Sequence, residues 1–326
     1  MKNLLIYIIT ILLIYFVISH FITTEQIELL HNVSLFQIFI SILIALVIFT
    51  VSGNQFSYIL FKSNKTKLSI PDRIGFPTAR NLWSYLIPFQ GSFAYSLAFI
   101  KFKYKVNLKD GLSINIYLLL FNFFFTGFVG IYYSLQSESL PTLFLIISLL
   151  LLSIPFMLIF FDKILKNIKT PDSKMLNFLI SNLSKVSTGI TLLWKDLKFT
   201  ANVFLFNIVH TIVTIIWFYW TVHIFNLDID LISVIFLALI LKISLIFRLT
   251  PGNLGVEQLI YGGIFALMNY DPKLGVLISL FHKSITILIS LSIGSIFTFI
   301  NFKYFSFSTV INSLKKNNLR THEDSK

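Results

Sequence analysis

The most specific pattern in the sequence is a short polar segment between two long apolar stretches. It runs from Arg248 to Gln258 and reads RLTPGNLGVEQ. Pro251 cannot continue a helix, and the glycines at 252 and 255 allow backbone turns that other residues avoid. A helix that begins near Leu254 would direct its free N–H groups and the positive end of its dipole into this segment. Such a helix start favours binding of a phosphate or a carboxylate.

Two charged residues flank this break. Arg248 adds a permanent positive charge whose planar geometry suits phosphate. Glu257 is expected either to pair with Arg248 or to contact a cationic headgroup. Charged side chains inside the membrane are costly, so we favour a functional role for both. The alternative is a plain helix break in which the two charges neutralise each other.

A second break of the same kind lies earlier in the chain, at Pro88-Phe89-Gln90-Gly91. The apolar segment around it, Leu82 to Ile100, has basic residues on both sides, among them Arg80 and Lys101. A single crossing would place one of these basic clusters outside the cell. We therefore expect two half-helices that enter and leave on the same side. A short helix lying on the membrane surface is the alternative.

The composition predicts an integral membrane protein. Of 326 residues, 56% are hydrophobic and 12% are charged, whereas a soluble domain carries about a quarter charged residues. The net charge of +12 comes from Lys and Arg in short runs between apolar segments. Such runs are typical of loops that face an anionic membrane surface, so nucleic acid is not an expected partner. The chain has no cysteine, and it shows no metal or cofactor motif.

Apolar stretches of about 20 residues predict membrane-spanning helices, because that length crosses the hydrocarbon layer. They run over Leu4 to Ile22, Leu35 to Phe61, Leu112 to Tyr133, Thr142 to Phe161, Ala201 to His223, Leu231 to Phe247 and Leu274 to Phe302. The loops between them are alternately acidic and basic. If Leu254 to Asn269 only dips into the membrane, the basic tail is left outside, whereas a crossing there returns the tail to the cytoplasm. We favour the crossing, and so expect about eight crossings and both termini in the cytoplasm.

A faint internal repeat suggests two halves. Gly91 lies twenty residues before Gly111, and Gly255 lies twenty before Gly275. Paired Pro/Gly breaks at matching places in two halves are typical of a transporter site at the interface of the repeats. We expect an all-α transmembrane domain, a joining segment and a polar cytoplasmic tail. The domain spans 1–305, with halves of about 1–161 and 200–305, the amphipathic joining segment spans 162–199, and the tail spans 306–326.

The string PGNLGV, from Pro251 to Val256, resembles the Pro-Gly-Gly/Asn-Leu-Gly-Val signature of a flippase-like membrane family. That family includes the transmembrane region of lysylphosphatidylglycerol synthases. The Pro88-x-x-Gly91 segment resembles the first-half motif of the family, and size and helix layout match over about residues 1–305. The resemblance implies repeated halves with broken, re-entrant helices that bind a lipid in the bilayer and move its headgroup between leaflets.

The chain departs from the family pattern at two places. Family members usually carry a glutamate three residues after the second glycine of the signature, where this chain has Gln258; Glu257 is one position earlier. In the first half, Ser92 follows Gly91, and no charge appears before Lys101. These departures leave the class of substrate open.

Other polar residues within the apolar stretches are weaker candidates. Lys283, next to His282, either lines the inner cavity or extends to the membrane interface. Asn207 and His210 are expected to form hydrogen bonds between helices rather than a binding site. Asp228-Ile229-Asp230 matches a metal-binding DxD pattern, but it lies in a very short loop with no nucleotide-binding domain around it.

We therefore expect a multi-pass cell-membrane protein that is a lipid flippase or transporter and not an enzyme, and that needs no cofactor. Its expected partner is a membrane lipid or lipid-linked substrate with a polar or charged headgroup. The alternative is a non-transporting scaffold for an envelope-biosynthesis enzyme that modifies glycans or lipids. The residues expected to line the binding site are Arg248, Pro251, Gly252, Asn253, Gly255, Glu257, Gln258, Gln90, Gly91 and Lys283.

Overall fold

The computed structural model describes residues 2–87, 91–106, 108–136, 142, 145–154, 157, 196–244 and 250–302. Within these ranges the chain is helical and contains no strand, which confirms the expected all-α class. The labelled elements are α1 (Lys2–Phe21), α2 (Thr24–His31), α3 (Leu35–Asn64), α4 (Ile70–Leu86), α5 (Gly91–Tyr104), α6 (Leu108–Gln136), α9 (Leu197–Ile224), α10 (Leu231–Ser244), η1 (Pro251–Asn253), α11 (Val256–Leu267), α12 (Pro272–Ile289), η2 (Ser290–Gly294) and α13 (Ser295–Ile300).

Four helices among the described residues are long and apolar enough to cross a membrane. They are Leu35–Lys62, Ile116–Gln136, Leu197–Ile224 and Pro272–Ile300. The segments Thr10–Phe21 and Thr24–His31, bent by 96° at the break between them, are a fifth candidate if the pair is one span. The chain is thus a polytopic membrane protein, as its composition predicts. Parts of two predicted spans, Thr142 to Phe161 and Leu231 to Phe247, lie outside the described residues.

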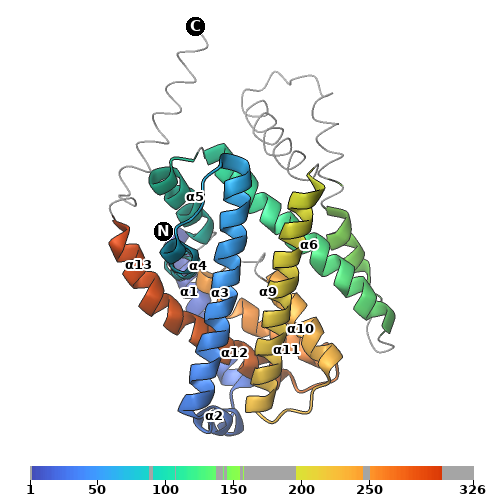
Figure 1. The fold of residues 1–326 in the computed structure, drawn as a ribbon. Coiled ribbons are helices and arrows are strands. Elements are labelled where there is room, and N and C mark those ends of the chain that lie inside the picture. The colour runs from blue at the N-terminus through green and yellow to red at the C-terminus, as the bar shows by residue number, and fades with distance from the viewer. Residues whose placement is uncertain are drawn as a thin grey trace.

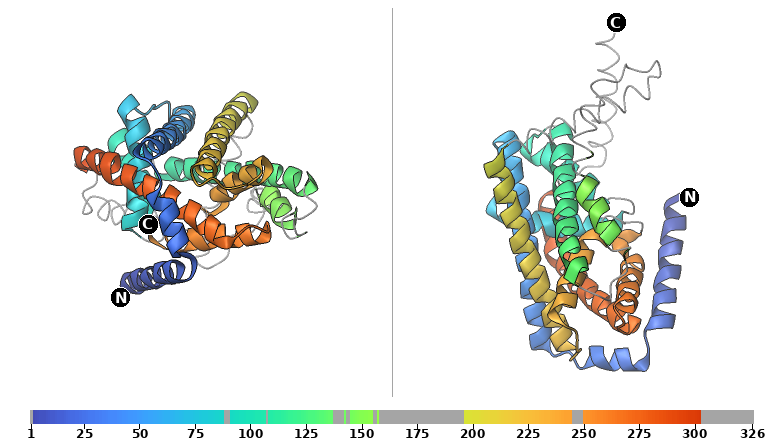
Figure 2. Two further views of the ribbon diagram at one scale, coloured as in Figure 1. Left: turned by 90° about the horizontal axis from the view of Figure 1, so that it is seen from below. Right: turned by 90° about the vertical axis from the view of Figure 1, so that its right-hand side faces the viewer.

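Helices α3 and α9 run side by side in opposite directions (Figure 1). Near the end of α3, Asn202 of α9 donates a hydrogen bond to the Tyr58 hydroxyl at 2.8 Å. Near the start of α3, Trp220 donates from Nε1 to Ser41 Oγ at 3.1 Å. This pair defines the long axis of the bundle. Figure 2 shows α1 on the far side of the bundle from α3, with α2 running beneath it from one to the other.

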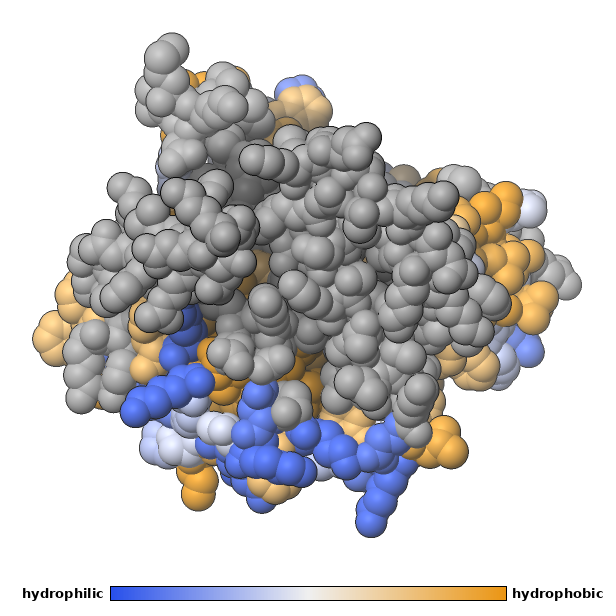
Figure 3. Space-filling view, turned by 90° about the horizontal axis from the view of Figure 1, so that it is seen from above, coloured by the Kyte–Doolittle hydropathy of each residue, from blue (hydrophilic) through white to orange (hydrophobic). Residues whose placement is uncertain are grey.

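The two ends of the bundle carry opposite charges. The end at which α3 finishes and α9 begins, called the basic end here, carries Lys62, Lys65, Lys67, Lys101, Lys103, Lys105 and Lys198. Hydrophilic residues gather along one side of this end in Figure 3. The opposite end, called the acidic end, carries Glu25, Glu28, Asp228, Asp230 and Asp271. The alternation of loop charges along the sequence thus becomes a separation of charge along the axis.

Helices α4 and α5 form a hairpin that begins and ends at the basic end. The hydroxyl of Tyr104, the last residue of α5, accepts a hydrogen bond from the Ser69 N–H before α4 at 3.0 Å. The same hydroxyl donates to the carboxylate of Asp72 in the first turn of α4. Lys103 pairs with Asp72 at 2.6 Å and donates to Asn301 Oδ1, just after α13, at 2.9 Å. These bonds hold the base of the first hairpin against the end of α13.

Helices α10 and α11 form a second hairpin, whose base lies at the acidic end. Tyr270, which follows α11, donates a hydrogen bond to Asp230, which precedes α10, at 3.0 Å. A tyrosine and a carboxylate therefore close each hairpin at its base.

The expected count of about eight crossings treats α10 and α11 as separate crossings, whereas in the structure the two helices return to one end. The division into halves of about 1–161 and 200–305 stays a prediction.

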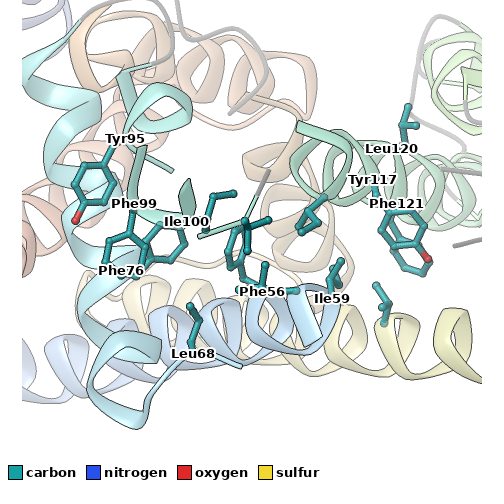
Figure 4. Close-up of a cluster of buried hydrophobic side chains, with 14 of the residues drawn as sticks. Phe56, Ile59, Leu68, Phe76, Tyr95, Phe99, Ile100, Tyr117, Leu120 and Phe121 are labelled. Atoms are coloured by element: carbon teal, nitrogen blue, oxygen red, sulfur yellow. The ribbon is translucent and has the colours of Figure 1, made fainter. Parts of the chain in front are cut away.

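A cluster of buried aromatic and aliphatic side chains packs the first hairpin against α3 (Figure 4). The ring of Phe76 in α4 lies between Phe56 of α3 and Phe99 of α5, with centroid separations of 4.8 and 4.9 Å. Ring contacts of this kind stabilise a core beyond the area that they bury. The first hairpin is therefore a well-packed part of the bundle.

Helix α4 also crosses the continuous helix formed by α12, η2 and α13 at very close range. A Cβ added to Gly294 of η2 would lie 2.8 Å from the Thr78 carbonyl oxygen of α4. On the other side of the crossing, a Cβ on Gly75 would lie 2.0 Å from the Phe297 ring. η2 is a single π-helical stretch, a feature often found at functional sites. The small residues allow α4 to bring its inner end close to α12.

Candidate functional site

The second Pro/Gly break folds into a tight turn at the inner end of the second hairpin. Gly252 and Gly255 adopt positive φ angles of 59° and 81°, and Asn253 adopts 61°. Positive φ is unfavourable for most side chains and natural for glycine. The Gly255 N–H donates to Gln258 Oε1 at 2.7 Å, so Gln258 caps the start of α11 with its own side chain.

This turn is wedged between α4 and α1. A Cβ on Gly252 would lie 1.9 Å from Tyr85 Cδ1, near the end of α4. A Cβ on Gly255 would lie 2.7 Å from Leu13 Cβ in α1. Tyr7 of α1 donates a hydrogen bond to the Leu86 carbonyl oxygen at 2.6 Å, so α1 also contacts the inner end of the first hairpin. The inner ends of both hairpins thus meet beside α1, in the interior of the bundle.

A buried ion pair lies against the turn. Lys283 Nζ of α12 contacts Glu257 Oε2 at 2.5 Å and donates to the Gly252 carbonyl oxygen at 2.9 Å. Glu257 is 3% exposed and Lys283 is 8% exposed. Lys283 lies well inside the apolar span Pro272–Ile300, which continues through this position without a break. Of the two readings open for Lys283, the structure supports an interior position rather than one at an interface.

The partner of Glu257 was not foreseen. The sequence suggested Arg248 or a ligand, but the described partner is Lys283, 26 residues away along the chain. Arg248 and Gln90 lie outside the described residues. Gly91 is the first residue of α5, and a Cβ there would lie 2.5 Å from the Trp83 carbonyl oxygen.

Several predicted site residues are buried together at the turn: Pro251, Gly252, Asn253, Glu257 and Gln258. The Nε2 atom of Gln258 has no hydrogen-bond partner among the described residues, and Gln258 is 1% exposed. A buried donor without an acceptor costs about 1–3 kcal/mol, so it is a ready partner for an oxygen atom of a ligand. These residues combine an ammonium group, a carboxylate and an amide donor in one small region.

Sequence reasoning missed Tyr85 and Thr286, which complete the wall of this region. The Tyr85 hydroxyl is hydrogen-bonded with Thr286 Oγ1 at 3.2 Å, and Lys283 Nζ lies 5.9 Å from the centre of the Tyr85 ring. The signal for Tyr85 was its position, three residues before Pro88 in the first break. No sequence pattern distinguished Thr286, whose position depends on the fold of α12 against α4.

The remaining polar candidates have structural roles. His282 and Thr221 form a hydrogen bond at 2.7 Å, and the His282 ring lies 4.1 Å from the Trp217 ring. Asn207 donates to the Val203 carbonyl oxygen within α9, instead of between helices as expected. Asp230 of the DxD pattern caps α10 by accepting from the Ser233 N–H at 2.9 Å. Among the described residues, no group of three or more His, Cys, Asp or Glu gathers as metal ligands.

A helical bundle with apolar spans, two inward hairpins and a buried charged turn defines a multi-pass membrane protein with a polar interior. The family model described as the lysylphosphatidylglycerol synthase transmembrane region matches residues 3–294. The chain belongs to this family, as the PGNLGV string predicted, and this membership indicates a role in lipid-related processes. No curated protein and no solved structure matches the chain.

Proposed function

We propose that this protein transports lipids, binding a polar or charged headgroup where the two hairpins meet and moving it between leaflets. The observation that carries the proposal is the buried pair of Lys283 and Glu257. Desolvating such a pair costs several kcal/mol per ion in an apolar setting, and ionisable groups inside a membrane usually mark a substrate path. The proposal involves no catalysis and no cofactor.

The chemistry of the turn matches a phosphate-containing headgroup. Lys283 supplies an ammonium group, Gln258 an amide donor, and the start of α11 the positive end of a helix dipole. Arg248, three residues before Pro251, would add a second cation. On α1, which contacts the turn through Leu13, the side chains of Ile11 and Leu12 are exposed and would face acyl chains that remain in the bilayer.

The proposed orientation places the basic end in the cytoplasm. Cytoplasmic loops are enriched in Lys and Arg. In the described residues, the lysines gather at the basic end and the carboxylates at the acidic end. The two hairpins are then re-entrant from opposite sides, so that their inner ends meet within the bilayer. Irregular backbone at that depth must be buried in protein, and the residues of the turn at Gly252 are buried. The C-terminus would lie in the cytoplasm, and we propose the same for the N-terminus.

A transport assay with paired variants tests this function. Lys283→Met and Glu257→Gln each leave one partner alone, while the double variant removes both charges and restores a neutral interior. We expect the double variant to fold, as judged by size-exclusion chromatography, and to move a labelled phospholipid in proteoliposomes at least about tenfold more slowly. Lys273→Met on the same helix and Glu28→Gln at the acidic end are the matched controls.

Wild-type transport by a folded double variant would remove the ion pair from the mechanism. A wild-type protein that moves no lipid, but that co-purifies with a lipid- or glycan-modifying enzyme at a fixed ratio, would favour the scaffold alternative. Native mass spectrometry of the purified protein identifies any lipid bound to it, and loss of that lipid in the double variant would support the site.

A further inference from the structure

We infer that Glu257 takes up a proton when an anionic headgroup binds Lys283, so that lipid movement is coupled to proton movement. The inference rests on the proposed function and concerns the same site. Its starting point is the direct contact of Lys283 Nζ with Glu257 Oε2 at 2.5 Å, which pairs the one ammonium group with a carboxylate. A phosphate that binds Lys283 must therefore share one ammonium group with a carboxylate.

Two negative charges on one ammonium group repel strongly in an interior of low dielectric constant. Proteins usually relieve such a conflict by protonating one of the two acids, as in carboxylate pairs that share a site. The phosphate diester of a lipid is a much stronger acid than a carboxyl group, so the proton goes to Glu257. Neutral Glu257 then releases Lys283 Nζ, which donates to a phosphate oxygen instead.

The titratable groups near the ion pair come from α4, α11 and α12. From α12 Glu257 faces Lys283, while His282 on the same helix is directed to Thr221 of α9. Tyr261, one turn further along α11, and Tyr85 of α4, whose ring centre lies 5.9 Å from Lys283 Nζ, are two further titratable groups near the pair. From α1, the described contact with the turn is the apolar Leu13. Arg248 lies outside the described residues.

The charges balance at each stage. Without ligand, the ammonium group and the carboxylate sum to zero; with ligand, the ammonium group, the neutral carboxylic acid and the phosphate monoanion also sum to zero. One proton is taken from water as the headgroup binds and is released as the headgroup leaves. Because Lys283, Glu257 and the phosphate sum to zero before and after binding, the exchange leaves the net charge of the site unchanged. A lipid without net charge would bind without this proton.

The test uses purified full-length protein in nanodiscs of phosphatidylcholine, with short-chain phosphatidylglycerol as the anionic probe. Titration calorimetry in two buffers of different ionisation enthalpy gives the number of protons taken up per bound lipid. We expect about one for the wild type and for Glu28→Gln, and none for Glu257→Gln, which still binds the probe. In proteoliposomes, one unit of pH difference should shift the distribution of phosphatidylglycerol between leaflets about tenfold, as for transport of one proton per lipid.

The outcomes separate the two proposals. Phosphatidylglycerol that binds and moves without proton uptake overturns the coupling and leaves the proposed function intact. Proton uptake that persists in folded Glu257→Gln overturns the assignment to Glu257. A probe that neither binds nor moves overturns both proposals. The wild-type measurement needs no substitution, so the coupling can be tested even if Glu257→Gln does not fold.

Discussion

At the scale of single residues, the pair of Glu257 and Lys283 places two opposite charges in contact within an apolar interior. The sequence alone marks Glu257 and Lys283 as costly charges within apolar surroundings. It does not reveal that they meet, because the contact depends on how α12 lies against the turn before α11. The two residues are 26 positions apart in the sequence, so no local sequence pattern predicts that their side chains meet.

The ion pair makes a residue-scale prediction about stability. Lys283→Met leaves Glu257 buried and uncompensated, and we expect a loss of about 3–5 kcal/mol, which is typical of breaking one side of a buried pair. The double variant Lys283→Met, Glu257→Gln should recover most of this loss. Thermal unfolding in detergent, followed by size-exclusion chromatography, measures both. A single variant as stable as the wild type would show that the pair is not desolvated.

At the scale of elements, the sequence predicted the breaks better than the paths of the helices. The turn at Pro251 to Gly255 was recognisable because proline and glycine have local effects, and so was the separation of α4, which ends at Leu86, from α5, which begins at Gly91. The return of α11 to the acidic end was one of two open alternatives, because the contact of Tyr270 with Asp230 joins residues 40 positions apart in the sequence. The spans Leu35 to Phe61 and Ala201 to His223 were predicted closely, since length and apolarity suffice for them.

The crossing of α4 with η2 makes an element-scale prediction. Gly294→Val would place a methyl-bearing carbon against the Thr78 carbonyl oxygen, which lies 2.8 Å from the position of a Cβ. We expect a loss of about 1–3 kcal/mol, as for overpacking of a core. Gly263→Ala is the matched control, because nothing described lies within 4 Å of a Cβ there. Equal melting temperatures for the two variants would contradict the close approach of α4.

The base of the second hairpin makes a prediction about pH. Burial acts to raise the pKa of the Asp230 carboxyl, but hydrogen bonds from Ser233 and Tyr270 hold this pKa below its ordinary value. A lowered pKa means that the carboxylate contributes stability above the ordinary value of about 3.9, and that this contribution fades as pH falls through the folded value. Tyr270→Phe should therefore reduce the acid sensitivity of the melting temperature, whereas Asp228→Asn should leave it unchanged.

At the scale of the whole molecule, the separation of charge predicts the orientation in the cell. The chain has no cysteine, so single cysteines can be placed freely. We expect Lys67→Cys, at the basic end, to react with a membrane-impermeant maleimide only after the cells are opened. Asp228→Cys, at the acidic end, should react in intact cells. The reverse pattern would show that the basic end lies outside and would contradict the proposed orientation.

The antiparallel partnership of α3 and α9, with a hairpin entering from each end, has a consequence for biosynthesis. Two antiparallel spans of equal length, Leu35–Lys62 and Leu197–Ile224, do not by themselves define which end belongs in the cytoplasm. The orientation in the membrane therefore depends mainly on the lysines of the basic end. Each lysine contributes about 1 kcal/mol near an anionic surface. Replacing Lys65 and Lys67 with glutamine should thus weaken the preference for one orientation, and Asp228→Cys should then label less completely in intact cells.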